Sequence, residues 1–155
     1  MVSPSQKRSD EHFMQQALGL AQAAEKLGEV PVGAVVVMNN KSIGTGMNQC
    51  VTDHDPSAHA EVLALKSAAG AIKNYRLDGA TLYVTLEPCL MCCGALLQAR
   101  ISRLVFGARE PRTGAVVSIH ESLRLAGVEP HVAVTEGVMA EESLKLLKQF
   151  FKTLR

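Results

Sequence analysis

A strand–helix–strand pattern in the middle of the chain most restricts how it can fold. Residues 80–86 and 103–108 are predicted strands, and Pro88 opens a predicted helix that runs to about Arg100 between them. Elements in this order form a right-handed crossover, so the two strands lie parallel in one sheet. Because active sites in such sheets lie at the carboxyl ends of the strands, we expect a site at the turn of residues 86–93.

The rest of the chain continues this alternation of helices and strands. Residues 9–27 predict a first helix capped by Ser9, because apolar side chains recur there at helical spacing. A β-branched run predicts a strand at residues 32–38, and Asn39-Asn40 suits a two-residue hairpin turn. The other expected elements are strands at residues 41–48 and 131–135 and helices at residues 58–71, 119–126 and from Met139 to the end of the chain. No repeat or linker interrupts the 155 residues, so we expect one domain with a mixed sheet between helices.

Composition and charge narrow the class of protein. Hydrophobic residues make up 47% of the chain and charged residues 20%, which is ordinary for a globular protein and excludes a disordered one. No apolar run reaches the roughly 18 residues of a membrane helix. Residues 1–10 lack the apolar core of a signal peptide, so we expect a cytoplasmic protein without membrane contact. The net charge is only +1, so attraction of a nucleic acid must come from a local patch.

Two short motifs carry the chemistry. His59-Ala60-Glu61 and Pro88-Cys89-Leu90-Met91-Cys92 each stand at the start of a predicted helix. Cysteines three residues apart are neighbours on a helix, and a helix N-terminus favours their thiolate forms. Three of the four cysteines, Cys89, Cys92 and Cys93, lie within five residues, which is typical of metal binding or redox chemistry rather than of a disulfide scaffold. The pattern therefore predicts two helix starts that converge on one metal ion.

The number of ligands indicates the kind of metal site. His59, Cys89 and Cys92 are one ligand short of a closed structural zinc site, whereas catalytic zinc sites keep three protein ligands and one water. Zn²⁺ with two thiolates and a neutral imidazole has no net charge, so it acidifies its water less strongly than a zinc ion with neutral ligands. A nearby base is then needed, and Glu61 is placed to act as that base.

The same residues also allow interpretations without a catalytic metal ion. His59 could be a buried core histidine. A structural zinc site could take Cys93 or Cys50 as its fourth ligand, although Cys93 follows Cys92 directly and adjacent residues on a helix point apart. We therefore expect Cys93 to be a small buried residue and Cys50 to be a loop thiol.

His-x-Glu followed by Pro-Cys-x-x-Cys is typical of zinc deaminases, and the resemblance extends further along the chain. The segments that carry it are residues 29–34, 54–61, 74–77, 85–89, 105–109, 113–115 and 150–152. Together they resemble the bacterial tRNA-specific adenosine deaminases of the cytidine deaminase-like superfamily. The resemblance implies an α/β fold, a three-layer α/β/α sandwich around a mixed sheet of about five strands, and a homodimer. It also implies action on the wobble adenosine of an arginine tRNA.

The same resemblance assigns roles to individual residues. It implies one zinc ion per chain bound by His59, Cys89 and Cys92, with Glu61 as the catalytic proton shuttle. The expected substrate-binding residues are Asn48, Ala60, Glu87, Glu110, Arg112, Phe151 and Arg155. Asn48 is expected to contact the base, the backbone around Ala60 and Glu87 to line the pocket, and Phe151 and Arg155 to contact the anticodon loop. Glu110 stands where the family usually has an aspartate near the ribose.

The final predicted helix has features of its own. Leu144, Leu147, Phe150, Phe151 and Leu154 form an apolar face, and beside it lie Lys145, Lys148, Lys152 and Arg155. A basic stripe with an aromatic border suits a splayed RNA loop. The alternative is an ordinary solvated helix face, and Glu141 on the same arc supports that alternative.

These features lead to one reaction and two alternatives. We expect hydrolytic deamination of adenosine to inosine in tRNA by zinc-activated water, with the anticodon loop as partner. The first alternative is a deaminase of a free base or nucleoside, such as guanine, cytosine or cytidine, which does not need the basic C-terminal face. The second is an RNA-binding module with structural zinc, but such a module has no use for Glu61.

Overall fold

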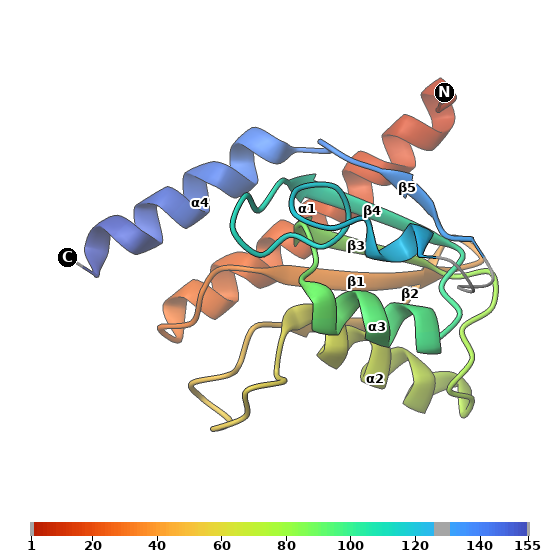
Figure 1. The fold of residues 1–155 in the computed structure, drawn as a ribbon, viewed down its shortest axis with the longest axis horizontal. Helices are drawn as coiled ribbons and strands as arrows, with labels where there is room; N and C mark the ends of the chain where they lie inside the picture. The colour runs from red at the N-terminus through yellow and green to blue at the C-terminus, as the bar shows by residue number, and fades with distance from the viewer. Residues whose placement is uncertain (1, 126–130, 155) are drawn as a thin grey trace.

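The computed structural model describes residues 2–125 and 131–154, which form three layers around one sheet (Figure 1). The elements are α1 (Pro4–Lys26), β1 (Gly33–Met38), β2 (Lys41–Met47), α2 (Ala60–Ile72), β3 (Thr81–Leu86), α3 (Leu90–Gln98), β4 (Arg103–Ala108), the 3₁₀ helix η1 (Ser122–Arg124), β5 (Ala133–Thr135) and α4 (Ala140–Thr153). Helices α1 and α4 cover one face of the sheet, and α2 and α3 cover the other. No helix in the described ranges combines the length and hydropathy of a membrane span.

The five strands lie in the order β2-β1-β3-β4-β5 and form a mixed sheet. The antiparallel pair β1–β2 is a hairpin, and β1 also pairs antiparallel with β3. In the turn between β1 and β2, Asn39 and Asn40 both have positive φ, 51° and 63°, as a tight hairpin requires. Strands β3, β4 and β5 are parallel, with α3 as the crossover between β3 and β4. The expected α/β/α sandwich with about five strands is confirmed.

Alternation along the strands divides the core into two parts. Val35, Tyr83 and Val105 point to one face, where they pack with the apolar side of α1. Their neighbours in sequence point to the other face and pack with α2 and α3, as Val36 and Val84 do. Successive strand residues face opposite sides of a sheet, so each buried strand supports both helical layers.

Two glycines in β2 let α2 approach the sheet closely. A Cβ on Gly46 would lie 2.6 Å from the Ala64 nitrogen, and one on Gly44 would lie 2.7 Å from Ala68 Cα. Both separations are too short for a side chain to fit. Helix α2 therefore lies directly against β2, and its first residue, Ala60, lies beside the end of that strand.

Several predicted boundaries were wrong. Helix α1 begins at Pro4, not at Ser9, because the Ser3 hydroxyl accepts a hydrogen bond from the Gln6 nitrogen and caps it, with proline in the first turn. Strand β5 is shorter than residues 131–135. Of residues 119–126, only Ser122–Arg124 are helical among those described, and they form a 3₁₀ turn.

Three helix termini also differ from the prediction. Helix α2 begins at Ala60 rather than at residue 58, and α3 begins at Leu90 rather than at Pro88. In both cases the preceding residue has extended backbone and serves as the N-cap. Helix α4 ends at Thr153, and Arg155 lies outside the described residues.

A buried ion pair joins α1 to the sheet. Both guanidinium Nη atoms of Arg103 donate to the Asp10 carboxylate at 2.7 Å, and the Tyr83 hydroxyl donates to it at 2.8 Å. Burial alone would raise the pKa of Asp10, but these hydrogen bonds outweigh it and hold the pKa below its ordinary value. The pair thus connects the start of α1 to the amino end of β4.

We predict that Asp10→Asn lowers the free energy of unfolding at pH 7 by about 3 kcal/mol, because Arg103 then keeps a largely buried charge without a charged partner. The pKa of Asp10 is lower in the folded state, so its contribution to stability is present above its ordinary pKa. That contribution is lost as the pH falls through the folded-state value. Urea titrations from pH 7 to pH 3 measure both effects. A variant with the same stability and acid sensitivity as the parent would contradict this role.

Candidate metal and substrate site

Two helix starts bring three ligand atoms together on one side of the sheet. His59 is the N-cap of α2 and Cys89 is the N-cap of α3, while Cys92 lies in the first turn of α3. The His59 Nδ1 atom is 3.6 Å from Cys89 Sγ and 3.5 Å from Cys92 Sγ. The three ligand atoms lie within 4.8 Å of one another, so among the described residues these three could hold a metal ion.

The electrostatics of this group suit a cation. Hydrogen bonding with Cys92 and His59 lowers the pKa of the Cys89 thiol to about 4. The hydrogen bond to Cys89 in turn raises the pKa of His59, and the same sharing together with burial raises the pKa of Cys92. The two sulfurs thus share negative charge at the start of α3, where the helix dipole also favours a thiolate.

Glu61 lies beside the three ligands. It belongs to the first turn of α2, two residues after His59, and only 4% of it is exposed. Burial raises the pKa of its carboxyl group above the ordinary value. His59 has extended backbone and precedes the helix, so it can share one site with Glu61 although residues two apart diverge on a regular helix.

A cleft of about 220 Å³ opens beside the ligands. It is lined by Val30, Val32, Asn48, His59, Glu61, Leu86, Glu87, Cys89 and Thr113. Leu86 is the last residue of β3, Val32 directly precedes β1 and Asn48 directly follows β2. The cleft therefore lies at the carboxyl end of β3, which is the position predicted from the strand–helix–strand pattern.

Asn48 is held in a fixed orientation at the cleft. Its Oδ1 atom accepts a hydrogen bond of 2.8 Å from the Ala60 backbone nitrogen. The oxygen is thereby committed to the start of α2, which leaves Nδ2 as the donor that Asn48 can offer to a molecule in the cleft. Ala60 itself is fully buried.

Glu87 has a role that its sequence position did not indicate. Its side chain is 3% exposed and accepts hydrogen bonds from the backbone nitrogens of the loop that follows β4. Its own backbone nitrogen donates to the Ala108 oxygen. Hydrogen bonds from the loop outweigh the effect of burial and hold the pKa of Glu87 below its ordinary value.

A second buried carboxylate, which the sequence analysis missed, holds the loop on the other side of the cleft. Glu29 is 2% exposed and accepts hydrogen bonds from the Val51 and Thr52 nitrogens, at 3.1 and 2.6 Å, and from the Thr52 hydroxyl. The partners lie 22 and 23 residues away in sequence, and no spacing rule connects them. This loop joins Asn48 to His59.

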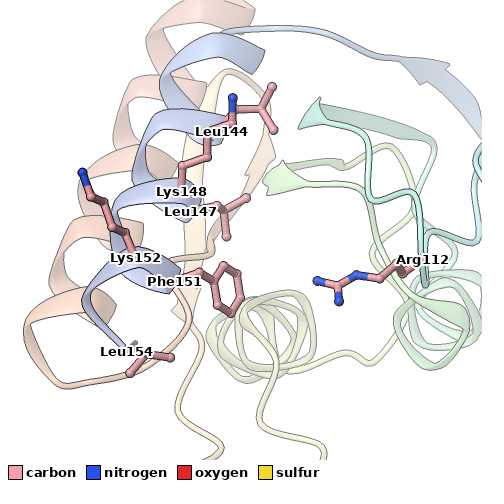
Figure 2. Close-up of a pocket in the computed structure, with 7 residues that line it drawn as sticks. All are labelled: Arg112, Leu144, Leu147, Lys148, Phe151, Lys152 and Leu154. Atoms are coloured by element: carbon pink, nitrogen blue, oxygen red, sulfur yellow. The ribbon is translucent and has the colours of Figure 1, made fainter.

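A larger groove of about 600 Å³ lies between α4 and the loop after β4. It is lined by Arg112, Leu144, Leu147, Lys148, Phe151, Lys152 and Leu154. Figure 2 shows the Arg112 side chain pointing across the groove toward Phe151. Thr113, the next residue after Arg112, lines the cleft, so cleft and groove adjoin along this loop.

The remaining residues singled out in the sequence are not part of the three-residue ligand group. The Glu110 nitrogen donates to Glu87, and its carboxylate accepts from the Arg112 nitrogen. Lys145 lines a neighbouring hollow between α1 and α4 instead of the groove. Cys93 is fully buried in the core, where burial raises the pKa of its thiol to about 12. The Cys50 thiol donates to the Pro56 oxygen at 3.9 Å, outside the metal-ligand group.

The mixed five-stranded sheet, with a His/Cys/Cys group at two helix starts, defines a deaminase of the cytidine deaminase-like class. A family model described as "MafB19-like deaminase" matches residues 8–155. A tRNA-specific adenosine deaminase from Haemophilus influenzae is 50% identical over 147 residues, which cover 94% of this chain and 85% of that protein. The chain belongs to the deaminase family that this model describes and to the family of the tRNA-specific adenosine deaminases.

Solved structures agree with this assignment. A structure from a study of A-to-I editing by tRNA:A34 deaminases superposes with a TM-score of 0.85 at 40% identity, covering 88% of this chain and 99% of that one. A guanine deaminase from Nitrosomonas europaea superposes with a TM-score of 0.75 at 25% identity, covering 97% and 85%. The fold is thus common to deaminases of different substrates, and the substrate must be argued from the site.

We predict that Cys92→Ala abolishes stoichiometric binding of a divalent transition-metal ion, whereas Cys93→Ala retains one ion per chain. The two variants lose the same atom at adjacent positions, but only Cys92 has its sulfur near His59. Elemental analysis of protein that has been saturated with metal and desalted measures the difference. Loss of metal from Cys93→Ala in a folded protein would support a fourth sulfur ligand instead.

Proposed function

We propose that this protein converts adenosine to inosine at the wobble position of a tRNA, by hydrolysis at a zinc site. The observation that carries the proposal is the meeting of His59, Cys89 and Cys92 beside the buried carboxyl group of Glu61, at the edge of a cleft. The relationship to tRNA-specific adenosine deaminases supports tRNA as the substrate.

The three ligands fit zinc. Two sulfurs and one imidazole nitrogen are a donor set that zinc takes at catalytic sites, and three protein ligands leave one position open. We propose one zinc ion per chain. Bound there, Zn²⁺ supplies a Lewis acid that lowers the pKa of a water molecule at the site.

Glu61 is the proposed proton shuttle. Its carboxylate accepts a proton from the attacking water and donates it to N1 of the adenine as the water oxygen bonds to C6. Glu61 then accepts the second proton from the hydroxyl group on C6 and passes it to the amino nitrogen. The bond from C6 to that nitrogen breaks and ammonia leaves, so adenosine and water give inosine and ammonia.

Asn48 and the walls of the cleft hold the base. With its oxygen committed to Ala60, the Nδ2 atom of Asn48 donates to a purine ring nitrogen. Val30, Val32 and Leu86 provide apolar surface for the faces of the ring. The cleft of about 220 Å³ is too small for a folded RNA, so the substrate nucleotide must be turned out of its stack.

The groove along α4 is the proposed site for the anticodon loop. It combines an exposed aromatic ring, Phe151, with the cations Arg112, Lys148 and Lys152. Bases unstacked from an RNA loop pack on aromatic rings, and their phosphates attract cations. Arg155 and a contact of Glu110 with the ribose belong to the same proposal.

We further propose a homodimer in the cytoplasm. Leu90 and Met91 on the outer side of α3 are 60% and 40% exposed, and large apolar side chains that lie together on a surface are suited to association. A cytoplasmic place suits a tRNA substrate and a site built from unpaired cysteines. The mass in solution, measured by sedimentation, tests the homodimer.

One assay separates this function from the alternative of a free-base or nucleoside deaminase. Ammonia release is measured from an anticodon stem-loop with adenosine at the wobble position, and from free adenosine, cytidine and guanine. We expect a value of kcat/KM for the stem-loop well above the others. A preference for a free base such as guanine would overturn the proposal.

We predict that Glu61→Gln lowers kcat by about 10²–10⁴-fold while the protein keeps its metal and its fold, because the amide has the same shape but cannot shuttle a proton. Single-turnover kinetics together with elemental analysis test this. Glu142→Gln, the same change at an exposed position in α4, serves as the control and should leave kcat unchanged. A near-parental rate for Glu61→Gln would show that another group moves the proton.

We predict that Phe151→Ala raises KM for the stem-loop by about tenfold, since base–aromatic stacking contributes about 1–3 kcal/mol. Lys152→Ala should also reduce the slope of log(kcat/KM) against log[salt] by about one, because one phosphate contact is lost. Lys7→Ala, on the distant first turns of α1, is the control. Point substitutions are better here than deletion of the helix end, because Phe150 is buried in the core. Unchanged KM and slope would leave the α4 groove without a role in binding.

A further inference from the structure

Glu87 lies between the metal ligands and the groove along α4. It follows the last residue of β3 directly and precedes Cys89 by two residues. Its carboxylate accepts hydrogen bonds from the loop after β4. The donors to its carboxylate are the backbone nitrogens of Glu110, Val116, Val117 and Ser118 and the hydroxyl of Ser118.

These donors surround both carboxylate oxygens. Oε1 accepts from the Glu110 nitrogen at 3.0 Å and from the Ser118 hydroxyl, and Oε2 accepts from three consecutive nitrogens at 2.8 to 3.1 Å. Backbone N–H groups that converge in this way form an anion-binding nest, occupied here by a side chain of the same protein. The conformation of residues 110–118 therefore depends on one negative charge.

The loop also packs tightly against Glu87 at Gly114, which has no side chain. A Cβ on Gly114 would lie 2.5 Å from Glu87 Oε1 and 2.5 Å from the Glu110 oxygen, so no side chain fits there. The two residues before Gly114 are those that face the substrate regions. Arg112 points into the groove along α4, and Thr113 lines the cleft.

We propose that Glu87 is the positioning residue that places Arg112 relative to the metal ligands, and that it thereby favours a looped RNA over a free nucleoside. This inference rests on the proposed function. Because Glu87 is joined to Cys89 by two peptide bonds and to the loop by five hydrogen bonds, it sets the distance between the reacting base and a phosphate contact of the same RNA.

Glu87→Gln tests this role with almost no change of shape. In either orientation of the new side-chain amide, its NH₂ group faces N–H or O–H groups that previously donated to the carboxylate. Two donors cannot bond to each other, so the loop must move. We expect KM for the anticodon stem-loop to rise about tenfold, with a smaller fall in kcat, because the arginine–phosphate contact is displaced. The metal content and the absorption bands of the Co²⁺-substituted protein should match those of the parent.

Gly114→Ala perturbs the same contact from the loop side and is the second variant. It leaves every acceptor in place and should raise KM for the stem-loop in the same way. Asp10→Asn is the control for destabilisation alone, since Asp10 pairs with the first residue of β4, at the other end of that strand. It should leave KM within about twofold, as expected for a distant, independent site.

A double-mutant cycle with Arg112→Ala decides whether Glu87 acts through that arginine. Arg112→Ala alone should raise KM about tenfold, but at most about twofold in the Glu87→Gln protein, because coupled residues are not additive. Additive effects of the two substitutions, or an unchanged KM in Gly114→Ala, would overturn the inference about Glu87. The proposed function would still stand in that case if the parent protein deaminates the stem-loop. If the parent protein instead turns over only a free base, the proposed function fails, and with it any role of Glu87 in selecting RNA.

Discussion

The close approach of α2 to β2 is the constraint on which the site depends. Gly44 and Gly46 leave room for the helix backbone to lie directly on the strand. The end of β2 is thereby placed beside the start of α2, where Asn48 accepts a hydrogen bond from Ala60 and His59 becomes the N-cap. The parallel crossover of β3, α3 and β4 brings Cys89 to the same place. Two helix starts that favour negative charge thus meet at the three residues that could hold a metal ion.

Buried carboxylates hold the loops on both sides of this centre. Glu29 accepts hydrogen bonds from the loop between Asn48 and His59, and Glu87 accepts them from the loop that contains Arg112 and Thr113. A buried charge is costly unless it is hydrogen-bonded, so each carboxylate stabilises one arrangement of its loop and disfavours others. The loops beside the cleft are therefore held in place by these hydrogen bonds, although they are not part of the sheet.

The proposed chemistry and the proposed RNA recognition occupy adjacent but different surfaces. The cleft beside the ligands has room for a base, and the groove along α4 has the aromatic and cationic groups that suit an RNA loop. A guanine deaminase from Nitrosomonas europaea has a similar fold, so the fold by itself does not select the substrate. The proposed selection depends instead on α4 and on the loop held by Glu87.

The sequence alone determined the order of the elements, the mixed sheet and the three residues that meet at the candidate metal site, because periodicity and short motifs record local structure. It did not indicate that Ser3 caps α1, since the residues around Ser9 also match a helix start. The partners of Glu29 and Glu87, and the position of Arg112 opposite Phe151, were decided only by the tertiary structure. The two carboxylates bind loops 22 to 31 residues away, mainly through backbone N–H groups that every residue except proline possesses, so no residue type or spacing indicates these partners. Arg112 and Phe151 face each other only because the loop after β4 and helix α4 lie side by side in the folded chain.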